Sequence, residues 1–251
     1  MRDSDDEVEE ELLADTSDDG AEQVNLASGE EPRTYWQAMS SPDRAQWEQA
    51  MQEELDAISQ LGTYQLTELP PGRNAINTKW VYRIKRDTDG HITHYKACLV
   101  VRGFTQKPGI DFDETFAPVV KIESIRLLCA LAAALDWEIH VIDINSAFLN
   151  SEMPPDQPAY VKQPVRFEAK GKEHLVWLLL KALYGLKQAG HLWYWKLCSI
   201  LEKLDFQACK SDPCVFFRSR KTGISIIASH VDDLGLYISC MAELVLLKQE
   251  I

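Results

Sequence analysis

Apolar residues recur at helical spacing in three stretches of the chain. The first stretch begins after Ser41-Pro42 and ends at Gly62, and it places four apolar residues on one face: Trp47, Met51, Leu55 and Ile58. The second stretch, Ile122 to Trp137, is apolar at most positions and predicts a buried helix. The third predicts a helix from about Ala189 to Leu204.

Strand-like alternation fills much of the remaining chain. Residues 77–86 alternate, a turn follows at Asp87-Thr-Asp-Gly90, and residues 91–101 return, which predicts a hairpin. Two further strands are expected at 138–143 and 174–180, with a loop between Pro154 and Pro164. A last hairpin is expected from about 223 to 239, followed by an apolar stretch, 241–251, that begins a helix.

The net charge of -13 is concentrated at the N-terminus. Residues 1–31 hold 13 carboxylates and one arginine, whereas the other 220 residues hold 25 Lys and Arg against 26 Asp and Glu. An acidic segment with few apolar residues cannot bury enough surface to offset its ordering entropy. Residues 1–32 are therefore expected to form a disordered acidic tail, either a solvated linker or an interaction segment.

The predicted hairpin is basic. Between Arg73 and Lys107 there are eight Lys or Arg against two Asp, a local charge of +6. Four aromatic residues are interleaved with these cations: Trp80, Tyr82, Tyr95 and Phe104. Cations can hold phosphates and aromatic rings can stack on bases, so the pattern is typical of a nucleic-acid partner. A charged strand face exposed to water explains the same pattern equally well.

Two classes of protein are disfavoured. The longest apolar run, Leu127 to Leu135, is too short to span a bilayer, so no membrane partner and a soluble, cytoplasmic chain are expected. The six cysteines show neither a CxxC pair nor the cysteine–histidine spacing of zinc sites. They are expected to be reduced, mostly buried thiols.

Three aspartates follow strand-like segments. Asp143 ends one apolar strand, and Asp232 and Asp233 lie at the bend of the last hairpin. If these strands are neighbours in one sheet, the three carboxylates converge at one edge, where like charges require a cation. Hard oxygen ligands suit Mg²⁺, and two such ions can support an in-line phosphoryl displacement. The alternative is that Asp232-Asp233 is an ordinary turn.

Seven short stretches, in this order, resemble one family, the reverse transcriptases of copia-type long-terminal-repeat retrotransposons. The stretches are Trp47-Glu-Gln-Ala-Met-Gln-Glu-Glu-Leu-Asp-Ala57, Lys79-Trp-Val-Tyr-Arg-Ile-Lys-Arg86, Gly103-Phe-Thr-Gln106, Asp113-Glu-Thr-Phe-Ala-Pro-Val119, Asp143-Ile-Asn-Ser-Ala-Phe-Leu149, Leu183-Tyr-Gly-Leu-Lys-Gln188 and Val231-Asp-Asp233. The resemblance extends from about Tyr35 to the last residue. It implies an RNA-directed DNA polymerase that acts on an RNA or DNA template-primer and deoxynucleoside triphosphates, within a polyprotein that also carries integrase and RNase H.

The resemblance also implies the fold class. An α+β right-hand polymerase fold is expected, with fingers-like residues 33–126 and a palm-like region, 127–251, that is truncated before the thumb. The palm would be an antiparallel sheet with helices on one face.

Site residues follow from the same resemblance. Asp143 and Asp232 are expected to bind two Mg²⁺ ions, with Asp233 as a third catalytic carboxylate. Phe148 would exclude a ribose 2'-hydroxyl, although an ordinary core aromatic fits there too. The remaining nucleotide-binding residues would be Gln188, Lys96 and Arg102.

Four positions depart from the family pattern. Cys98 and Asn145 stand where a basic residue or lysine is usual, His230 where tyrosine is usual, and His191 where arginine is common. These changes leave a second hypothesis open, a catalytically inactive remnant that at most binds nucleic acid. A third hypothesis, an interaction protein working through its acidic tail, is the least favoured.

Overall fold

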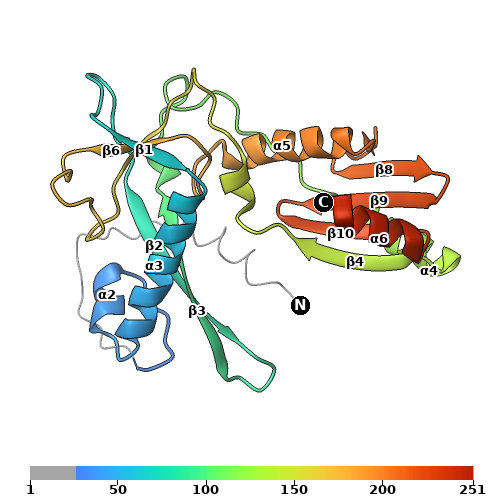
Figure 1. The fold of residues 1–251 in the computed structure, drawn as a ribbon, viewed down its shortest axis with the longest axis horizontal. Helices are drawn as coiled ribbons and strands as arrows, with labels where there is room; N and C mark the ends of the chain where they lie inside the picture. The colour runs from blue at the N-terminus through green and yellow to red at the C-terminus, as the bar shows by residue number, and fades with distance from the viewer. Residues whose placement is uncertain (1–26, 251) are drawn as a thin grey trace. The chain divides into compact units, whose positions relative to one another are not determined.

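The computed structural model describes residues 27–250, which form two compact units (Figure 1). Of the described residues, unit 1 comprises 27–113 and 152–187, and unit 2 comprises 114–151 and 188–250. The chain therefore passes between the units three times, and residues 152–187 fall in the same unit as the predicted basic hairpin. Both units are mixed α/β with antiparallel sheets. Among the helices described, none combines the length and apolar character needed to cross a membrane.

Unit 1 contains a hairpin and a second small sheet. Its elements are α2 (Tyr35–Ser40), α3 (Arg44–Gln60), β1 (Tyr64–Thr67), β2 (Thr78–Arg86), β3 (Ile92–Val101), the 3-10 turn η1 (Gly103–Thr105), β5 (Tyr160–Lys162) and β6 (Val176–Leu179). The predicted hairpin is confirmed as β2 paired with β3. Strands β1, β6 and β5 pair in that order, and no periodic signal in the sequence predicted β1 or β5.

Helix α3 packs against the hairpin through the predicted apolar face. Trp47, Met51 and Ile58 are fully buried. The Trp47 ring lies edge-on to Tyr82, with the ring centroids 5.2 Å apart. Consequently Tyr82 and Trp80, which are 2% and 6% exposed, belong to the core and cannot stack on bases. The prediction of aromatic rings interleaved on a binding surface was wrong for these two residues.

Residues 28–31 were predicted to belong to the disordered acidic tail, but they form hydrogen bonds with the rest of unit 1. Asp43 accepts hydrogen bonds from the Ser28 hydroxyl and the Gly29 N–H. Burial alone would raise the pKa of Asp43, but these hydrogen bonds outweigh it and lower the pKa. Glu31 accepts from the Ile84 N–H and pairs with Arg83. Residues 1–26 of the predicted tail lie outside the described residues.

Unit 2 is built on a five-stranded antiparallel sheet with the order β4-β10-β9-β8-β7. Its elements are α4 (Ile122–Leu135), β4 (Glu138–Asp143), the 3-10 turn η2 (Ala147–Asn150), α5 (Ala189–Lys203), β7 (Gln207–Ala208), β8 (Val215–Arg220), β9 (Gly223–His230), β10 (Asp233–Ile238) and α6 (Met241–Glu250). The predicted strand at 138–143, the third helix and the last hairpin are confirmed.

Helices lie on both faces of this sheet. On one face, Leu128 and Ala132 of α4 pack against Ala228 and Tyr237. On the other face, Glu243 of α6 accepts a hydrogen bond from Ser225. Since Ser225 and Ala228 lie three residues apart on β9, they face opposite sides. The expectation of helices on one face only was therefore wrong.

Helix α4 is also less buried than its composition suggests. Only Leu128 and Ala132 are buried, whereas Leu127 and Leu135 are 69% and 53% exposed. An apolar run predicts a helix but not how many of its faces find a partner. The cysteines show a similar error: all six are free, as expected, but only Cys214 is buried.

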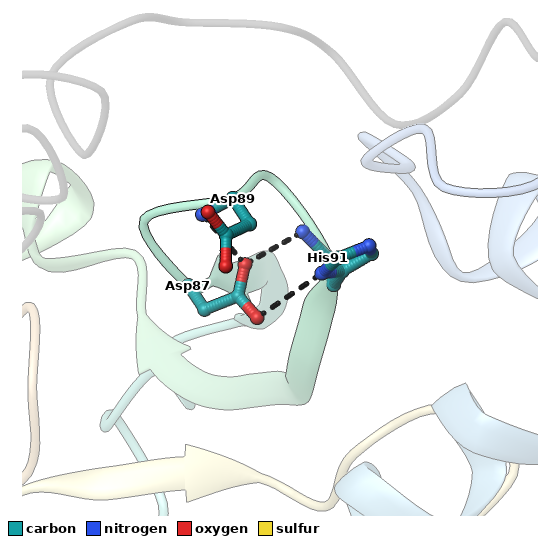
Figure 2. Close-up of side chains that lie close together, drawn as sticks. All are labelled: Asp87, Asp89 and His91. Carbon is teal, nitrogen blue, oxygen red and sulfur yellow. Dashed lines mark hydrogen bonds and ion pairs between the residues drawn. The ribbon is translucent and has the colours of Figure 1, made fainter.

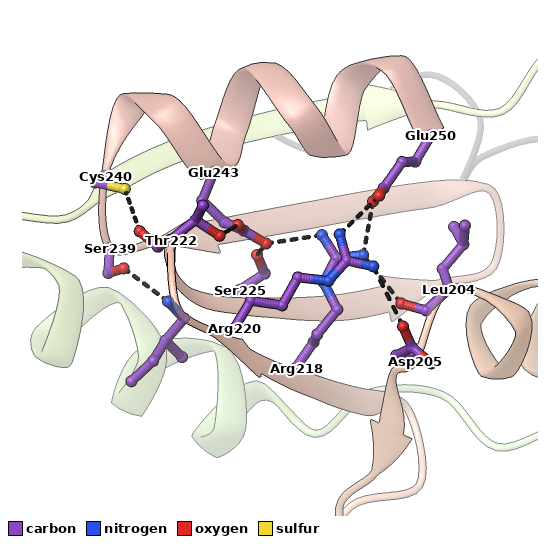
Figure 3. A network of polar contacts seen from close by, with 11 residues as sticks. Leu204, Asp205, Arg218, Arg220, Thr222, Ser225, Ser239, Cys240, Glu243 and Glu250 are labelled. Carbon is purple, nitrogen blue, oxygen red and sulfur yellow. Dashed lines mark hydrogen bonds and ion pairs between the residues drawn. The ribbon is translucent and has the colours of Figure 1, made fainter.

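A polar network holds α6 on the sheet (Figure 3). The Arg218 guanidinium and the Glu243 carboxylate form an ion pair at 2.8 Å, and both side chains are almost completely buried. Ser225 and Thr222 also donate hydrogen bonds to Glu243. Burial alone would raise the pKa of Glu243, but the hydrogen bonds and the Arg218 charge lower it below its usual value.

Candidate active site

Two of the predicted aspartates face each other across neighbouring strands. Asp143 is the last residue of β4 and Asp233 the first residue of β10, and these two residues are direct partners in the antiparallel register. Directly opposed residues point to the same face of a sheet, with Cβ atoms about 5 Å apart. Asp143 is exposed and Asp233 half-buried. The sheet therefore presents two carboxylates together at one edge.

Asp232 lies in the turn beside this pair. His230 and Asp233 are register partners, so Val231 and Asp232 form a two-residue turn between β9 and β10. The Asp232 carbonyl oxygen accepts a hydrogen bond of 3.0 Å from the Ile144 N–H. The segment after β4 is thus joined to the turn, which brings the predicted third aspartate to the same edge of the sheet.

These residues fit a magnesium site by their chemistry. All three donors are hard carboxylate oxygens, and Mg²⁺ usually takes only one or two protein carboxylates and keeps several waters. Asp143 is exposed and Asp232 half-buried, so water can reach the edge. That these carboxylates bind Mg²⁺ stays a prediction.

A different group comes closest to a compact metal cluster. Within the described part of the chain, one set of three ligand atoms lies within 4.8 Å of one another, contributed by Asp87, Asp89 and His91 (Figure 2). The three aspartates at the sheet edge do not form such a set among the described residues. Asp87 already accepts hydrogen bonds from the Asp89 and His91 N–H groups. This cluster is explained as the polar turn of the β2–β3 hairpin.

Phe148 and Gln188 are buried residues of unit 2. Phe148 lies in η2, which packs against α5, and its side chain is 6% exposed. Gln188 stands at the N-cap of α5 and is 1% exposed; its carbonyl oxygen accepts from the Leu192 N–H. Burial suits an ordinary core role for Phe148 as well as a nucleotide-facing one, so both interpretations stay open.

Lys96 and Arg102 belong to unit 1. Lys96 lies on β3 opposite Arg83. Burial raises the pKa of the Glu54 carboxyl, and the charge of Lys96 offsets part of that rise. The Arg102 guanidinium lies 5.1 Å from the centre of the Phe104 ring, which is 55% exposed. Of the four aromatic residues in the basic stretch, Phe104 is the one with a largely exposed ring.

Residues 61–251 match the family model described as reverse transcriptase (RNA-dependent DNA polymerase). The chain belongs to the reverse transcriptase family. The match covers all the residues of the sheet edge, from Asp143 to Asp233.

The chain is similar to Pol polyproteins of copia-type transposons. It is 44% identical over 214 residues to the retrovirus-related Pol polyprotein from transposon TNT 1-94 of Nicotiana tabacum, which covers 85% of this chain. It is 37% identical over 212 residues, 84% of this chain, to the Pol polyprotein from transposon RE1 of Arabidopsis thaliana. The matched regions amount to 16% and 14% of these relatives, so the chain spans about a sixth of their length.

All four residues that depart from the family pattern are among the described residues. Asn145 is exposed and lies two residues after β4. His191 makes a hydrogen bond of 2.8 Å between Nδ1 and the Phe116 carbonyl oxygen, which requires Nδ1 to carry the proton. His230, half-buried, is the register partner of Asp233 next to the turn. Cys98 lies on β3 opposite Val81 and is half-buried.

Sequence reasoning missed a contact between two of the family stretches. The backbone after β3 and the backbone before α5 lie in close contact at Gly103 and Gly185. Only glycine permits this contact, because a Cβ on Gly185 would overlap the Val101 carbonyl oxygen. The Val101 N–H donates to the Tyr184 carbonyl oxygen at 2.8 Å. A glycine in each stretch was a sequence signal for close backbone approach, but the sequence does not show that these two glycines are neighbours in space.

The Gln106 side chain completes this contact. Its Oε1 accepts a hydrogen bond of 2.8 Å from the Lys187 N–H, immediately before Gln188, and Gln106 is 5% exposed. The stretch Gly103-Phe-Thr-Gln106 therefore helps to fix the segment that ends in the predicted nucleotide-binding glutamine.

Proposed function

We propose that this chain is the RNA-directed DNA polymerase segment of a copia-type Pol polyprotein. The observation that carries the proposal is the direct pairing of Asp143 with Asp233, with Asp232 in the adjoining turn, in a chain of the reverse transcriptase family. The reaction joins a primer 3'-hydroxyl to the α-phosphorus of a deoxynucleoside triphosphate, and pyrophosphate leaves.

In this proposal Asp143 and Asp232 hold the metal ions. Two magnesium ions, when bound, would stabilise the attacking oxygen and the leaving oxygen of the displacement. Asp233, facing Asp143 across the strands, adds negative charge that favours cation binding at the edge. By holding the ions at one sheet edge, the carboxylates would help to align the primer end with the triphosphate, and such alignment is a main task in phosphoryl transfer.

The other site residues select and bind the nucleotide. Phe148, five residues after Asp143, would occupy the space that a ribose 2'-hydroxyl needs. The enzyme would therefore accept deoxynucleotides, and the product would be DNA. Gln188 would contact the incoming nucleotide. Lys96 and Arg102 would neutralise phosphates of the triphosphate or the template. The relatives are named Pol polyproteins, which supports a chain that works as part of a longer polyprotein.

A second candidate is nucleic-acid binding without catalysis. The His191 ring, where the family commonly has arginine, already contacts the Phe116 carbonyl oxygen, so this position offers no permanent cation to a phosphate. The basic stretch of unit 1 would then provide the remaining affinity.

Primer extension on an RNA template with Mg²⁺ separates these candidates. Extension by the wild-type chain, reduced about a hundredfold or more by Asp232→Asn, supports the polymerase. Asp136→Asn is a matched control, because it makes the same chemical change on an exposed residue after α4. No extension by the wild type, with template binding that weakens steeply with salt, supports the second candidate.

A further inference from the structure

The turn that carries Asp232 contains a strained residue. Val231 has a φ of 54°, in the left-handed region. A β-branched residue is rarely found there, because its Cβ substituents crowd the backbone. Such a conformation persists only when the surrounding structure holds it. Contacts that oppose relaxation of this turn therefore control where Asp232 lies.

Trp193 makes such a contact. Its indole N–H donates a hydrogen bond of 2.7 Å to the Val231 carbonyl oxygen. The Trp193 side chain is 3% exposed and lies on α5, where Leu197 and Leu201 are also buried. Because indole has one donor and a buried ring has little freedom to move, this hydrogen bond fixes the direction of the Val231 carbonyl.

The next carbonyl of the turn is held from another element. The Asp232 carbonyl oxygen accepts from the Ile144 N–H at 3.0 Å, one residue after Asp143. Two consecutive carbonyls, of Val231 and Asp232, are thus fixed by α5 and by the segment after β4. The Asp232 residue lies between these two anchors.

We propose that Trp193 is a positioning residue, which holds the strained Val231 turn so that the Asp232 carboxylate stays beside Asp143. This role rests on the proposed function, because the position of the Asp232 carboxylate affects catalysis only if the chain is a polymerase. Trp193 contacts neither the metal ions nor the substrate in this proposal. A buried indole N–H usually finds an acceptor, and here that acceptor is the carbonyl of the strained residue itself.

The test uses Trp193→Phe, which keeps a buried aromatic ring and removes the donor. Trp195→Phe is the matched control, since Trp195 lies on the same helix and is 58% exposed. Hydrogen exchange of the Ile144 amide, measured by NMR, reports on the turn without requiring activity. The proposal predicts that Trp193→Phe speeds this exchange about tenfold and that the control leaves it unchanged. Unchanged exchange in Trp193→Phe would overturn it.

A double-mutant cycle separates restraint of the Val231 turn by the Trp193 hydrogen bond from packing of the Trp193 ring in the core. Asparagine tolerates a positive φ better than valine, so Val231→Asn reduces the strain that Trp193 must oppose. The fall in melting temperature caused by Trp193→Phe should be smaller in the Val231→Asn background, whereas equal falls in both backgrounds would overturn the proposal. If Trp193→Phe alone does not fold, recovery of folding in the double variant supports the proposal, and no recovery contradicts it.

Kinetics complete the test. Trp193→Phe should lower kcat for primer extension about tenfold while KM for the deoxynucleotide stays within about twofold, because only the alignment of Asp232 changes. A rise in KM with unchanged kcat would overturn the positioning role. If the wild-type chain extends no primer, the proposed function fails, and the exchange and melting experiments still decide whether Trp193 holds the turn.

Discussion

Asp143 and Asp233 are direct partners in the antiparallel register of β4 and β10. The pairing brings together two residues that are 90 positions apart in the sequence. It also gives each strand a fixed end at the same edge, next to the turn that carries Asp232. The proposed chemistry depends on this edge, and the predictions below test the edge, the elements that support it and the basic stretch of unit 1.

The Gly103–Gly185 contact predicts an unequal cost for two glycine substitutions. Gly185 has a φ of 85° and no room for a Cβ against the Val101 carbonyl, whereas Gly109 has a φ of 73° and open space around it. Both are in unit 1. Gly109→Ala should cost about 1 kcal/mol of unfolding free energy, from the backbone conformation alone. Gly185→Ala should cost about 3 kcal/mol or more, because the backbones must also separate. Equal costs in urea denaturation would contradict the close contact.

The buried ion pair of α6 predicts a large effect of one charge. Glu243→Gln should lower the free energy of unfolding by about 3 kcal/mol, because it removes the fully buried carboxylate and leaves Arg218 with only the partly exposed Glu250 as a charged partner. Glu250→Gln removes another carboxylate that contacts Arg218, but Glu250 is 28% exposed, so its loss should cost about 1 kcal/mol or less. Similar losses would show that the pair is not specially stabilising.

The pKa of Glu243 gives this effect a pH dependence. A carboxyl with a lowered folded pKa contributes stability that is present above its unfolded pKa and lost as the pH falls through its folded pKa. The difference between the wild type and Glu243→Gln should therefore be full at neutral pH and shrink in acid. Chemical denaturation at several pH values measures it.

Glu54 is expected to behave in the opposite way. Burial raises its pKa, while the Leu99 N–H and the Lys96 charge offset the rise only in part. The folded state then binds its proton more readily than the unfolded chain, so ionised Glu54 destabilises the fold above the raised pKa. Glu54→Gln should raise the melting temperature by a few degrees at pH 7, and the gain should vanish below the unfolded pKa. A lower melting temperature at pH 7 would contradict this assignment.

The Glu31–Arg83 contact predicts weak competition with nucleic acid. The ion pair measures 2.9 Å, and the same carboxylate accepts from the Ile84 N–H. Glu31→Gln should tighten binding of an RNA–DNA template-primer about two- to fivefold at low salt and steepen its salt dependence, because it removes a carboxylate that competes with a phosphate for the Arg83 guanidinium. Fluorescence anisotropy across a salt series measures this. Glu30→Gln changes the net charge equally and leaves the pair intact; equal tightening in both would contradict the specific contact.

The sequence predicted the elements whose period is strong. Helix α3, the β2–β3 hairpin and the β9–β10 hairpin were found because each repeats its apolar spacing over two or more turns or strands. The β1–β6–β5 sheet was not predicted, because three short strands from distant segments pair only through tertiary contacts. The exposed flank of α4 was missed for a related reason: composition does not say which helix faces have neighbours.

The site was predictable only in part. The alternation predicted Asp143 at a strand end and Asp232-Asp233 at a hairpin bend, but the direct pairing of Asp143 with Asp233 depends on the register of strands that are not neighbours in sequence. The resemblance implied that Asp143 and Asp232 share metal ions, but it did not predict which residues pair across the strands. The Trp193–Val231 hydrogen bond had no sequence signal, since Trp193 fits the apolar face of α5 equally well as a core residue.

The most direct test is the incorporation of a single deoxynucleotide onto a DNA primer paired with an RNA template, over a Mg²⁺ titration. The wild-type chain and Asp136→Asn should incorporate the nucleotide with the same Mg²⁺ dependence. Asp143→Asn and Asp232→Asn should each lose the reaction by about a hundredfold or more at every Mg²⁺ concentration, because each removes a proposed metal ligand. Undiminished incorporation by either variant, or none by the wild type, would contradict a polymerase centre at this sheet edge.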